Sequence, residues 1–455
     1  MRSHWLGLVS AALAACGDNL PAPETYGVSS GTRLEARFWD AGGGARIFRA
    51  WFDRELRVEC TFDLATDGRF RCMPTPANQS LVYGDAACTG SLVTVPVCRP
   101  APAFAFGPAR ATPGCGRSLS RPIHEVGGVH AATVFSKSFD GACRPHVLES
   151  GYQAHQLGAE RPPDEFVGAT LAVRGDARLA PYVLVGDDGS ALFDGVWDTR
   201  RNGECGPTGL STTCKPVEIA LHYDFLFSDA GCTMNNAAAD LSDARPCHLP
   251  TAVVGHGSPF GSELLEIGAQ LPVGSVYRRN SSSVTCTTEV PIDDETFWLE
   301  GAPIPNESFA PMSSVSEGTG RVRAERWVDG EGRSLAASRG FVDTEQDEAC
   351  YPRELADGAR CVSSFGETKD TFSDASCKTP VLFWTGEKPP LVFTVHHARD
   401  ACDHVEYDAA YETGDAVTQV SYFQMQTTGC TAVQVPPDVT LYKLGAKVAV
   451  PRLDR

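Results

Sequence analysis

Short segments in which apolar and polar residues alternate recur along the chain, and this period of two predicts β-strands. In residues 33–39, for example, Leu34, Ala36 and Phe38 alternate with charged residues. Turn-forming sequences follow such segments at residues 40–42, 187–189 and 329–330, where Gly and Asp tolerate hairpin backbone angles. Only residues 262–271 have apolar positions at helical spacing, so they are predicted as one short helix.

The same pattern of residues occurs three times. Asp53, Asp198 and Asp343 are 145 residues apart, and each is followed seven positions later by a cysteine. A second motif, aspartate three residues before cysteine, ends at Cys88, Cys232 and Cys377. The repeat divides the chain into three units, at about residues 31–167, 168–310 and 311–455, which we call units 1, 2 and 3.

Each unit is expected to contain two related halves. An apolar residue precedes a cysteine by eight positions in most halves, and the marker cysteines recur on average about every 74 residues, at Cys60, Cys143, Cys205, Cys286, Cys350 and Cys430. Six half-units of short strands predict an all-β fold, and radial repetition makes a six-bladed β-propeller the expected architecture. Three tandem β-sandwich-like domains are the alternative. The connections between units are short and apolar, which favours a single propeller-like domain over residues 31–455.

Composition and charge support an exposed β-protein and exclude one class of partner. The 455 residues include 44 Gly and 31 Pro, which is typical of a chain rich in turns. The formal net charge is −18, and no stretch rich in Lys or Arg interrupts the acidic background. Nucleic acid is therefore excluded as a partner, because a nucleic-acid binder needs a basic surface.

The N-terminus has the features of an export signal. Arg2 is followed by an apolar stretch at residues 5–15, which is too short to span a bilayer but suits a signal peptide. The stretch ends in Leu13-Ala14-Ala15-Cys16, which resembles the lipobox of bacterial lipoproteins. The resemblance implies that residues 1–15 are removed, that Cys16 carries a lipid that anchors the protein to a membrane, and that residues 16–30 form a tether.

Two further points qualify the export signal. Gly17, directly after the cysteine, resembles the pattern of lipoproteins sent to the outer membrane, so an outer-membrane location in the cell envelope is expected. The alternative is an ordinary signal peptide cleaved after Ala15, which would leave Cys16 free.

Without Cys16, sixteen cysteines remain, an even number in a chain directed to an oxidising compartment, so disulfides are expected. Three pairs are close in sequence and suit a disulfide across a hairpin: Cys60 with Cys72, Cys205 with Cys214, and Cys350 with Cys361. Such a loop contributes about 2 to 4 kcal/mol in chain-entropy arguments. The pairing of the other ten cysteines stays open.

Several groups of residues have side chains suited to a catalytic or metal site, but none is predicted to be one. His396, His397, Cys402 and His404 have ligand types suited to zinc, but Cys402 is better explained as a disulfide partner. Residues 255–261 include Ser258, but Pro259 removes the N–H that a hydrolase serine loop needs. The aspartates of residues 187–189 and 329–331 are interpreted as hairpin turns rather than calcium ligands.

The repeated Asp53, Asp198 and Asp343 are predicted to cap turns, because an active site needs one asymmetric arrangement whereas a fold element is needed in every unit. The sequence therefore favours a non-catalytic lipoprotein with a binding or scaffold role for a protein, peptide or glycan partner, without cofactors. A secreted propeller hydrolase or lyase acting on a carbohydrate or lactone is the alternative. Both rest on fold and compartment alone.

Overall fold

The computed structural model is an all-β protein, and its only helical elements among the described residues are two short 3-10 turns. It describes residues 27–74, 80–97, 100–112, 115–138, 142–148, 151–207, 212–217, 219–223, 225–240, 250–254, 264–272, 274–279, 285–289, 296–335, 340–355, 358–363, 367–368, 371–384, 389, 392–396, 407–419, 421–426, 429–436 and 439–454. The short alternating segments and frequent turns of the sequence account for this fold class.

The strands of unit 1 fall into two groups. A two-residue strand, β1 (Val28–Ser29), precedes the first half, which is a meander of β2 (Leu34–Asp40), β3 (Arg46–Asp53), β4 (Val58–Leu64) and β5 (Phe70–Pro74). The second half contains β6 (Leu81–Tyr83), β7 (Ser91–Pro96), β8 (Phe104–Phe106), β9 (Arg110–Thr112), β10 (Cys115–Ser120), β11 (Ile123–Val129), β12 (Val134–Lys137), β13 (Cys143–His146), β14 (Tyr152–Glu160) and the 3-10 turn η1 (Pro163–Glu165). The strands thus begin at Val28, within the range expected to be a tether.

Units 2 and 3 repeat this division. The first halves consist of β15 (Gly168–Val173), β16 (Leu179–Gly186), β17 (Ala191–Asp198), β18 (Gly203–Gly206) and β19 (Thr213–Pro216) in unit 2, and of β28 (Ala310–Glu317), β29 (Val322–Asp329), β30 (Gly340–Asp343), β31 (Glu348–Leu355) and β32 (Gly358–Ser363) in unit 3.

The second half of unit 2 contains β20 (Ile219–His222), β21 (Leu226–Phe227), β22 (Ala237–Asp240), β23 (Ala252–Val254), β24 (Leu264–Leu271), β25 (Tyr277–Arg279), β26 (Cys286–Thr288), β27 (Thr296–Pro303) and η2 (Asn306–Ser308). The second half of unit 3 contains β33 (Glu367–Thr368), β34 (Thr371–Phe372), β35 (Val381–Trp384), β36 (Val392–His396), β37 (Tyr407–Val417), β38 (Ser421–Gln426), β39 (Gly429–Gln434) and β40 (Thr440–Val448).

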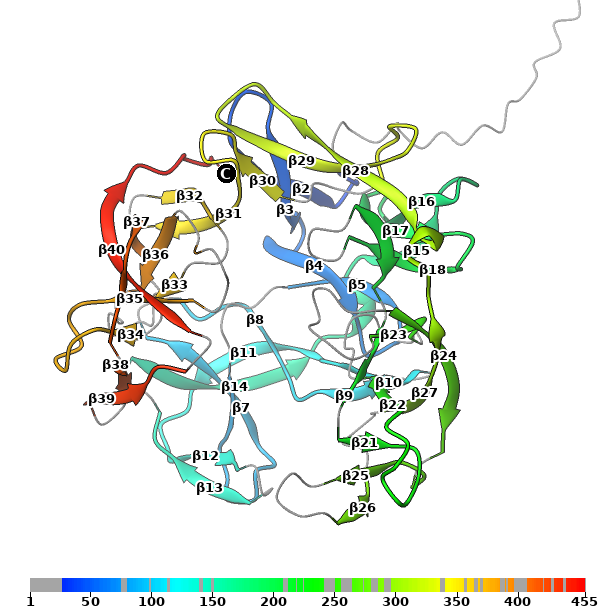
Figure 1. Cartoon of the computed structure of the whole chain (residues 1–455). Coiled ribbons are helices and arrows are strands. Elements are labelled where there is room, and N and C mark those ends of the chain that lie inside the picture. Colours follow the sequence, from blue (N-terminus) through cyan, green and yellow to red (C-terminus); the bar gives the residue numbers. More distant parts are fainter. Residues whose placement is uncertain are drawn as a thin grey trace, which may run out of the picture.

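The three first halves pair with one another in a ring, and the second halves of units 1, 2 and 3 lie at the bottom, right and left of Figure 1. We call the boundary between units 1 and 2 the 1–2 junction and name the other two boundaries in the same way. At the 1–2 junction, β15 of unit 2 pairs with β5 of unit 1 and also with β16 of its own unit. At the 2–3 junction, β28 pairs in the same way with β19 and β29. Each unit therefore donates its first strand to the sheet of the preceding unit.

The ring closes at the 3–1 junction through the last residues of the chain. Residues 451–454 occupy the place that β15 and β28 fill elsewhere: the N–H of Cys361 bonds to the carbonyl of Pro451, and Asp454 pairs with Asp40 of β2 through two backbone hydrogen bonds of 2.8 and 2.9 Å. The corresponding bond at the 1–2 junction joins Cys72 N–H to the carbonyl of residue 167. The repeat thus ends with a segment that completes the sheet of unit 1.

The hydrophobic core is divided among the three junctions. Each junction has a cluster of buried side chains that contains one hairpin disulfide: Val28, Leu34, Trp51, Cys60, Cys72 and Val167 at the 1–2 junction; Leu179, Val196, Cys205, Cys214, Ala310, Met312, Trp327 and Leu335 at the 2–3 junction; and Ala45, Val322, Ala324, Phe341, Cys350, Ala359, Cys361 and Leu453 at the 3–1 junction. The last two clusters contain buried residues of both neighbouring units, and at the 1–2 junction the partly buried Leu192 of unit 2 packs against the cluster. Separate domains joined by linkers would not share cores in this way.

The predicted short helix at 262–271 is wrong, because residues 264–271 form the strand β24. The apolar residues Leu264, Ile267 and Leu271 suggested a helical period, but irregularities in register on both sides of Ile267 break the alternation expected of a strand. The strand pairs with β23 on one side and β27 on the other. Gly268 lies so close to β27 that an added Cβ would stand 2.8 Å from the backbone oxygen of Leu299.

The two halves of each unit are unlike in structure. The first halves are antiparallel meanders, whereas β20 of unit 2 and β33 of unit 3 each pair in parallel with a later strand. In unit 2, five strands of the second half close into a small barrel, β20-β22-β27-β24-β23. The similarity of the halves therefore does not extend to their strand arrangement.

Candidate functional site

The three repeated aspartates are buried and cap a turn, as their repetition predicts. The side chains of Asp53, Asp198 and Asp343 are at most 2% exposed. In unit 1, the Oδ1 atom of Asp53 accepts hydrogen bonds from the backbone N–H groups of Glu55 and Leu56 at 2.9 and 3.1 Å. Asp198 and Asp343 accept equivalent bonds from the residues that follow them. These carboxylates are structural elements of every unit.

Each aspartate also forms an ion pair with an arginine. The arginines occupy equivalent positions in the three units, but the sequence alone does not indicate that they pair with the aspartates. Arg33 forms a bidentate ion pair with Asp53, in which Nε and Nη2 donate to the carboxylate oxygens Oδ1 and Oδ2 at 2.9 and 2.8 Å. The same Nη2 donates to the carbonyl of Glu165 in η1, at 2.8 Å. The ion pair therefore fastens the first half of unit 1 to the turn that leads into unit 2. Arg178, which pairs with Asp198, reaches the carbonyl of Ser308 in η2 in the same way.

The three hairpin disulfides expected from the cysteine spacing are present. Cys60 is bonded to Cys72, Cys205 to Cys214 and Cys350 to Cys361. All six sulfurs lie within the core clusters at the junctions. They hold the strands on which the neighbouring unit docks.

Three further disulfides, which the sequence left open, join distant parts of each second half. Their pairs are Cys88 with Cys143, Cys232 with Cys286 and Cys377 with Cys430. The two cysteines of each pair are 55, 54 and 53 residues apart in sequence. This nearly constant separation between the cysteine of the aspartate motif and the later marker cysteine is the signal from which the pairing could have been predicted. Cys98, Cys247 and Cys402 lie outside the described residues, as does the side chain of Cys115.

A tight turn built by an aspartate positions each of these cysteines. Asp85 accepts backbone hydrogen bonds from Ala87 and Gly90, and Cys88 between them has a positive φ of 52°. The N–H groups of Gly90 and Thr89 hold the pKa of Asp85 below its usual value. Equivalent turns, each with an aspartate of lowered pKa, precede the cysteines of units 2 and 3. The repeated aspartate therefore positions the cysteine for its disulfide.

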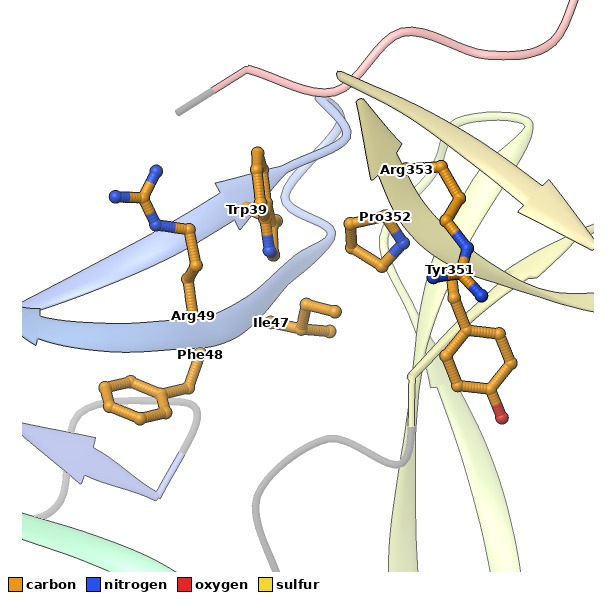
Figure 2. Close-up of a pocket in the computed structure, with 7 residues that line it drawn as sticks. All are labelled: Trp39, Ile47, Phe48, Arg49, Tyr351, Pro352 and Arg353. Carbon is orange, nitrogen blue, oxygen red and sulfur yellow. The ribbon is translucent and has the colours of Figure 1, made fainter. Parts of the chain in front are cut away.

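The groove at the 3–1 junction is the candidate binding site. It has a volume of about 530 Å³ and is lined by Trp39, Ile47, Phe48, Arg49, Tyr351, Pro352 and Arg353. The first four come from the β2–β3 hairpin of unit 1 and the last three from β31 of unit 3. Figure 2 shows Trp39, Ile47 and Pro352 between the two strands, with Arg49 and Phe48 toward one end and Arg353 and Tyr351 toward the other. The groove exists only because the ring brings units 1 and 3 together.

The lining combines aromatic rings with two guanidinium groups and contains no carboxylate. Arg49 lies over the ring of Trp39, with its Cζ atom 5.1 Å from the ring centre, and also pairs with Glu59 on β4. Arg49 is the extra residue at an irregularity in the β2–β3 register, which lies between the pairs Arg37–Ala50 and Phe38–Phe48. A bulge of this kind changes the direction of a side chain, and here it favours the position of the Arg49 guanidinium over the Trp39 ring. Tyr351 is 36% exposed, so its ring is accessible at the surface.

Two turns considered for calcium are structural. The carboxylate of Asp188 accepts N–H bonds from Ser190 in its own hairpin and from Arg33 and Leu34 of unit 1, at 2.7 to 3.1 Å. Burial raises the pKa of Asp188, but these hydrogen bonds outweigh it and lower the pKa overall. Asp329 accepts N–H bonds from Glu331 and Arg333 within its turn. Both confirm the interpretation as hairpin turns.

Cys16, residues 255–261 and the histidines and cysteine at 397–404 lie outside the described residues, and so does the side chain of His396. Within the part of the chain that the structure describes, no group of three or more His, Cys, Asp or Glu side chains is arranged to hold a metal ion. Over the same residues, no helix has the length and hydrophobicity needed to cross a membrane.

Comparison with known proteins identifies a family but no function. The chain matches the Family of unknown function (DUF7481) over residues 8–110, 51–166 and 242–455, which together cover most of its length, and it belongs to that family. The first two matches overlap, as expected where one chain contains repeated units. No curated protein and no solved structure matches the chain.

Proposed function

We propose that this protein is a non-catalytic binding lipoprotein of the bacterial cell envelope, in which a ring of three repeated units presents a groove to a partner. The observation that carries the binding role is the groove at the 3–1 junction. Its exposed Tyr351 ring and its arginines Arg49 and Arg353 have no counterparts of the same type at the equivalent positions of the 1–2 junction. The 3–1 junction thus differs in side-chain chemistry from the 1–2 junction, as a site that is not repeated in every unit should.

The envelope location rests on the export signal and the cysteines. Leu13-Ala14-Ala15-Cys16 resembles a lipobox, and six disulfides join twelve of the remaining cysteines among the described residues. Disulfides persist in oxidising compartments such as the periplasm and the cell surface. A lipid on Cys16 would hold the ring at a membrane, with the outer membrane favoured by Gly17.

The finer architecture is also a proposal. We infer that the six half-units surround one axis in the manner of a six-bladed propeller, with two blades in each unit. Support comes from the edge-to-edge pairing of the first halves and from the closure by residues 451–454. The shared cores at the junctions argue for this ring over three tandem sandwich domains.

The anchoring is tested in cells that export the protein. Mass spectrometry of the mature N-terminus should show a diacylglyceryl group on Cys16, and the protein should fractionate with outer-membrane vesicles. Cys16→Ser should release it into the soluble fraction, whereas Ser30→Ala should leave it bound. An unmodified N-terminus after cleavage at Ala15 would contradict the proposal.

The binding role is tested separately in the intact envelope. A photo-crosslinking amino acid at Tyr351 should form a discrete adduct with an envelope component, and the same substitution at Thr61 should not. Thr61 is the equivalent position at the 1–2 junction, since it follows Cys60 as Tyr351 follows Cys350. Adducts of equal yield at both positions, or at neither, would contradict a specific role for the groove.

A further inference from the structure

At the 1–2 junction, the short strand β1 of unit 1 lies along the edge of a strand of unit 2. It pairs antiparallel with β17, and the N–H of Phe193 donates to the carbonyl of Gly27 at 2.8 Å. Residues 27–29 thereby cover residues 191–193 on the side of β17 that faces away from β16. The pairing of β17 with β18 does not reach this part of the strand, because it includes only residues 196–198. The strand β1 is therefore an addition to an edge that would otherwise be open.

The equivalent edge at the 3–1 junction forms one wall of the groove. Residues 46–48 of β3 lie 145 positions before residues 191–193, and both strands have the same irregularity in register directly afterwards. On one side, residues 46–48 pair with β2; on the other side, the β3–β4 pairing covers only residues 51–53. In the part of the chain that the structure describes, no strand pairs with residues 46–48 on this second side. Ile47 and Phe48 instead line the groove.

The segment of unit 3 that corresponds to β1 does not cross to the next unit. Arg33 corresponds to Arg321, so residues 27–29 correspond to residues 315–317 at the end of β28. These residues pair with β29 of their own unit, opposite residues 324–326. Among the described residues, β1 therefore has no counterpart at the 3–1 junction, and the edge of β3 is left to the groove.

The side chain of Val28 shows what an added strand contributes to a junction. It is 1% exposed and belongs to the core cluster at the 1–2 junction, against which Leu192 and Phe62 also pack. Leu192 corresponds to Ile47, and Phe62 corresponds to Pro352 by its distance from the hairpin cysteine. Figure 2 shows Ile47 and Pro352 on opposite walls of the groove. An apolar side chain between them would be buried as Val28 is, which favours binding through the hydrophobic effect.

The backbone of β3 offers hydrogen bonds to such a strand. Along a strand in an antiparallel sheet, the N–H and C=O groups of successive residues point alternately to the two sides. The N–H of Phe193 points away from β16 and binds β1. Phe48 has the same position in β3, so its backbone groups point into the groove. Pro352 on the opposite wall has no N–H to offer, so an added strand would pair with β3 rather than with β31.

The segment that fits this edge has a small residue followed by an apolar one. Gly27 has a positive φ of 69°, and an added Cβ would stand 2.5 Å from the ring of Phe193. Glycine is therefore expected beside Phe48 as well. The chain's own copy of such a segment is buried at the 1–2 junction through Val28, so a second copy of the chain has none to donate. The occupant is thus expected to come from a different protein.

We propose that the groove at the 3–1 junction binds an extended peptide segment of another envelope protein, which adds as a strand to residues 46–48 and places an apolar side chain between Ile47 and Pro352. This inference rests on the proposed binding function and names its partner class. In strand addition, main-chain hydrogen bonds contribute affinity, and the pockets for alternate side chains contribute specificity.

The probe is a fluorescent synthetic peptide that copies residues 25–31, and its binding to the mature, disulfide-bonded chain is measured by fluorescence anisotropy. Val28→Asp in the peptide should weaken binding about tenfold, because a charge would enter the apolar space. The N–H of Ser29 points to the same side as the carbonyl of Gly27, so N-methylation at Ser29 should also weaken binding about tenfold. N-methylation at Val28, whose N–H points away from β3, is the matched control and should leave binding unchanged.

The site is identified by a photoreactive diazirine side chain at the Val28 position of the peptide. Adducts should map to Ile47 and Pro352. Adducts at Leu192 and Phe62 would show that the peptide replaces the chain's own β1, and would overturn the inference.

A variant of the protein tests the same contact from the other side. Ile47→Thr keeps the branched shape of the side chain and should weaken binding about fivefold, because a hydroxyl replaces apolar surface in the groove. Val315→Thr, at an apolar side chain that is 38% exposed on β28, is the control and should bind the peptide as the parent does. Circular dichroism of both variants establishes that they fold.

Each contrary result has a distinct meaning. Equal binding of the two N-methylated peptides would show recognition by side chains alone and overturn strand addition. A dimer of the parent chain in sedimentation, dissociated by the peptide, would identify a second copy as the occupant and overturn the assignment to another protein. Failure of the peptide to bind, with a specific crosslink still formed at Tyr351 in cells, would overturn this inference alone. Equal crosslinks at Tyr351 and Thr61 would overturn the proposed binding function itself.

Discussion

The 1–2 and 3–1 junctions are built on the same frame but differ in how they are closed. At the 1–2 junction, β15 of unit 2 pairs with β5 of unit 1, and the carboxylate of Asp188 ties the hairpin of unit 2 to unit 1. At the 3–1 junction, residues 451–454 take the place of such a strand. At the 3–1 junction, Gly43 stands at the position of Asp188, and its backbone oxygen accepts a hydrogen bond from Thr319 N–H at 3.0 Å. The same backbone frame thus tolerates different side chains.

This comparison separates what holds the ring together from what makes one junction special. Disulfides, buried aspartates and donated strands recur at the junctions and account for the fold. At the 3–1 junction, Arg49 and Arg353 stand where the 1–2 junction has Asp194 and Asp63. Trp39 and Tyr351 stand where it has Leu184 and Thr61. Repetition therefore marks structure, and departure from repetition marks the candidate site.

The largest effect is expected from breaking the 1–2 junction at Asp53. Asp53→Ala removes the turn cap and leaves Arg33, whose side chain is only 18% exposed, without its main partner. We expect a loss of about 4 kcal/mol in the free energy of unfolding, measured by urea titration with the disulfides intact. Glu55→Ala is the control: Glu55 also pairs with Arg33 but is 69% exposed, and it should cost less than about 0.5 kcal/mol. Equal effects would contradict the role of burial.

A somewhat smaller effect is expected from the 3–1 junction at Leu453. Its side chain is 3% exposed and belongs to the core cluster that contains Cys350 and Cys361. Leu453→Ala should lower the free energy of unfolding by about 3 kcal/mol, because it removes buried methyl groups and leaves a cavity. The neighbouring Arg452→Ala, at an exposed side chain, should change it by less than about 0.5 kcal/mol. A neutral Leu453→Ala would show that the end of the chain does not close the ring.

The smallest effect is a pH dependence of stability that arises from Asp188, which is present at the 1–2 junction and replaced by Gly43 at the 3–1 junction. The pKa of Asp188 is lowered in the folded protein, so its contribution to stability is fully present above the unfolded pKa of about 3.9 and is lost as pH falls through the folded pKa. The difference in stability between the parent and Asp188→Asn should therefore be largest above pH 5 and shrink toward pH 2. Because Asp188 is partly exposed, we expect less than about 1 kcal/mol.

The control for this pH dependence is Asp187→Asn. Asp187 is 54% exposed and pairs with Arg69 on the surface. The free energy of unfolding of Asp187→Asn should differ only slightly from that of the parent, and salt should reduce this difference further. A difference for Asp188→Asn that stays constant from pH 6 to pH 2 would contradict the assigned hydrogen bonds.

The repeated parts of the fold could be predicted from the sequence. Asp53 and Cys60 recur with Asp198 and Cys205 at a constant interval, and a capped turn followed by a hairpin disulfide was the physical interpretation of that interval. The strand predicted at residues 33–39 follows from alternation alone, and the observed β2 spans Leu34–Asp40. These features depend on contacts between residues close in sequence, which a periodic pattern records.

Contacts between distant residues were less accessible. The pairing of Cys88 with Cys143 depends on how strands of the second half cross, and nothing local specifies it. Residues 262–271 predict a helix instead of the observed strand β24, because bulges beside Gly268 disturb the alternation of the strand. The groove was not predicted at all, since Trp39 and Tyr351 are about 300 residues apart in the chain and meet only when the ring closes.

The most direct test of this account is a designed disulfide between Asp40→Cys and Asp454→Cys. These residues are directly opposed in an antiparallel pair and exchange both backbone hydrogen bonds. Such pairs have a Cα separation of about 5.5 Å, which suits a disulfide. We predict that peptide mapping of the exported double variant finds this bond together with the six native disulfides. The free energy of unfolding of the double variant should also exceed that of the control Asp40→Ser/Asp454→Ser, which cannot form the bond. Two free thiols at these positions in the folded protein would contradict closure of the ring, and with it the groove between units 1 and 3.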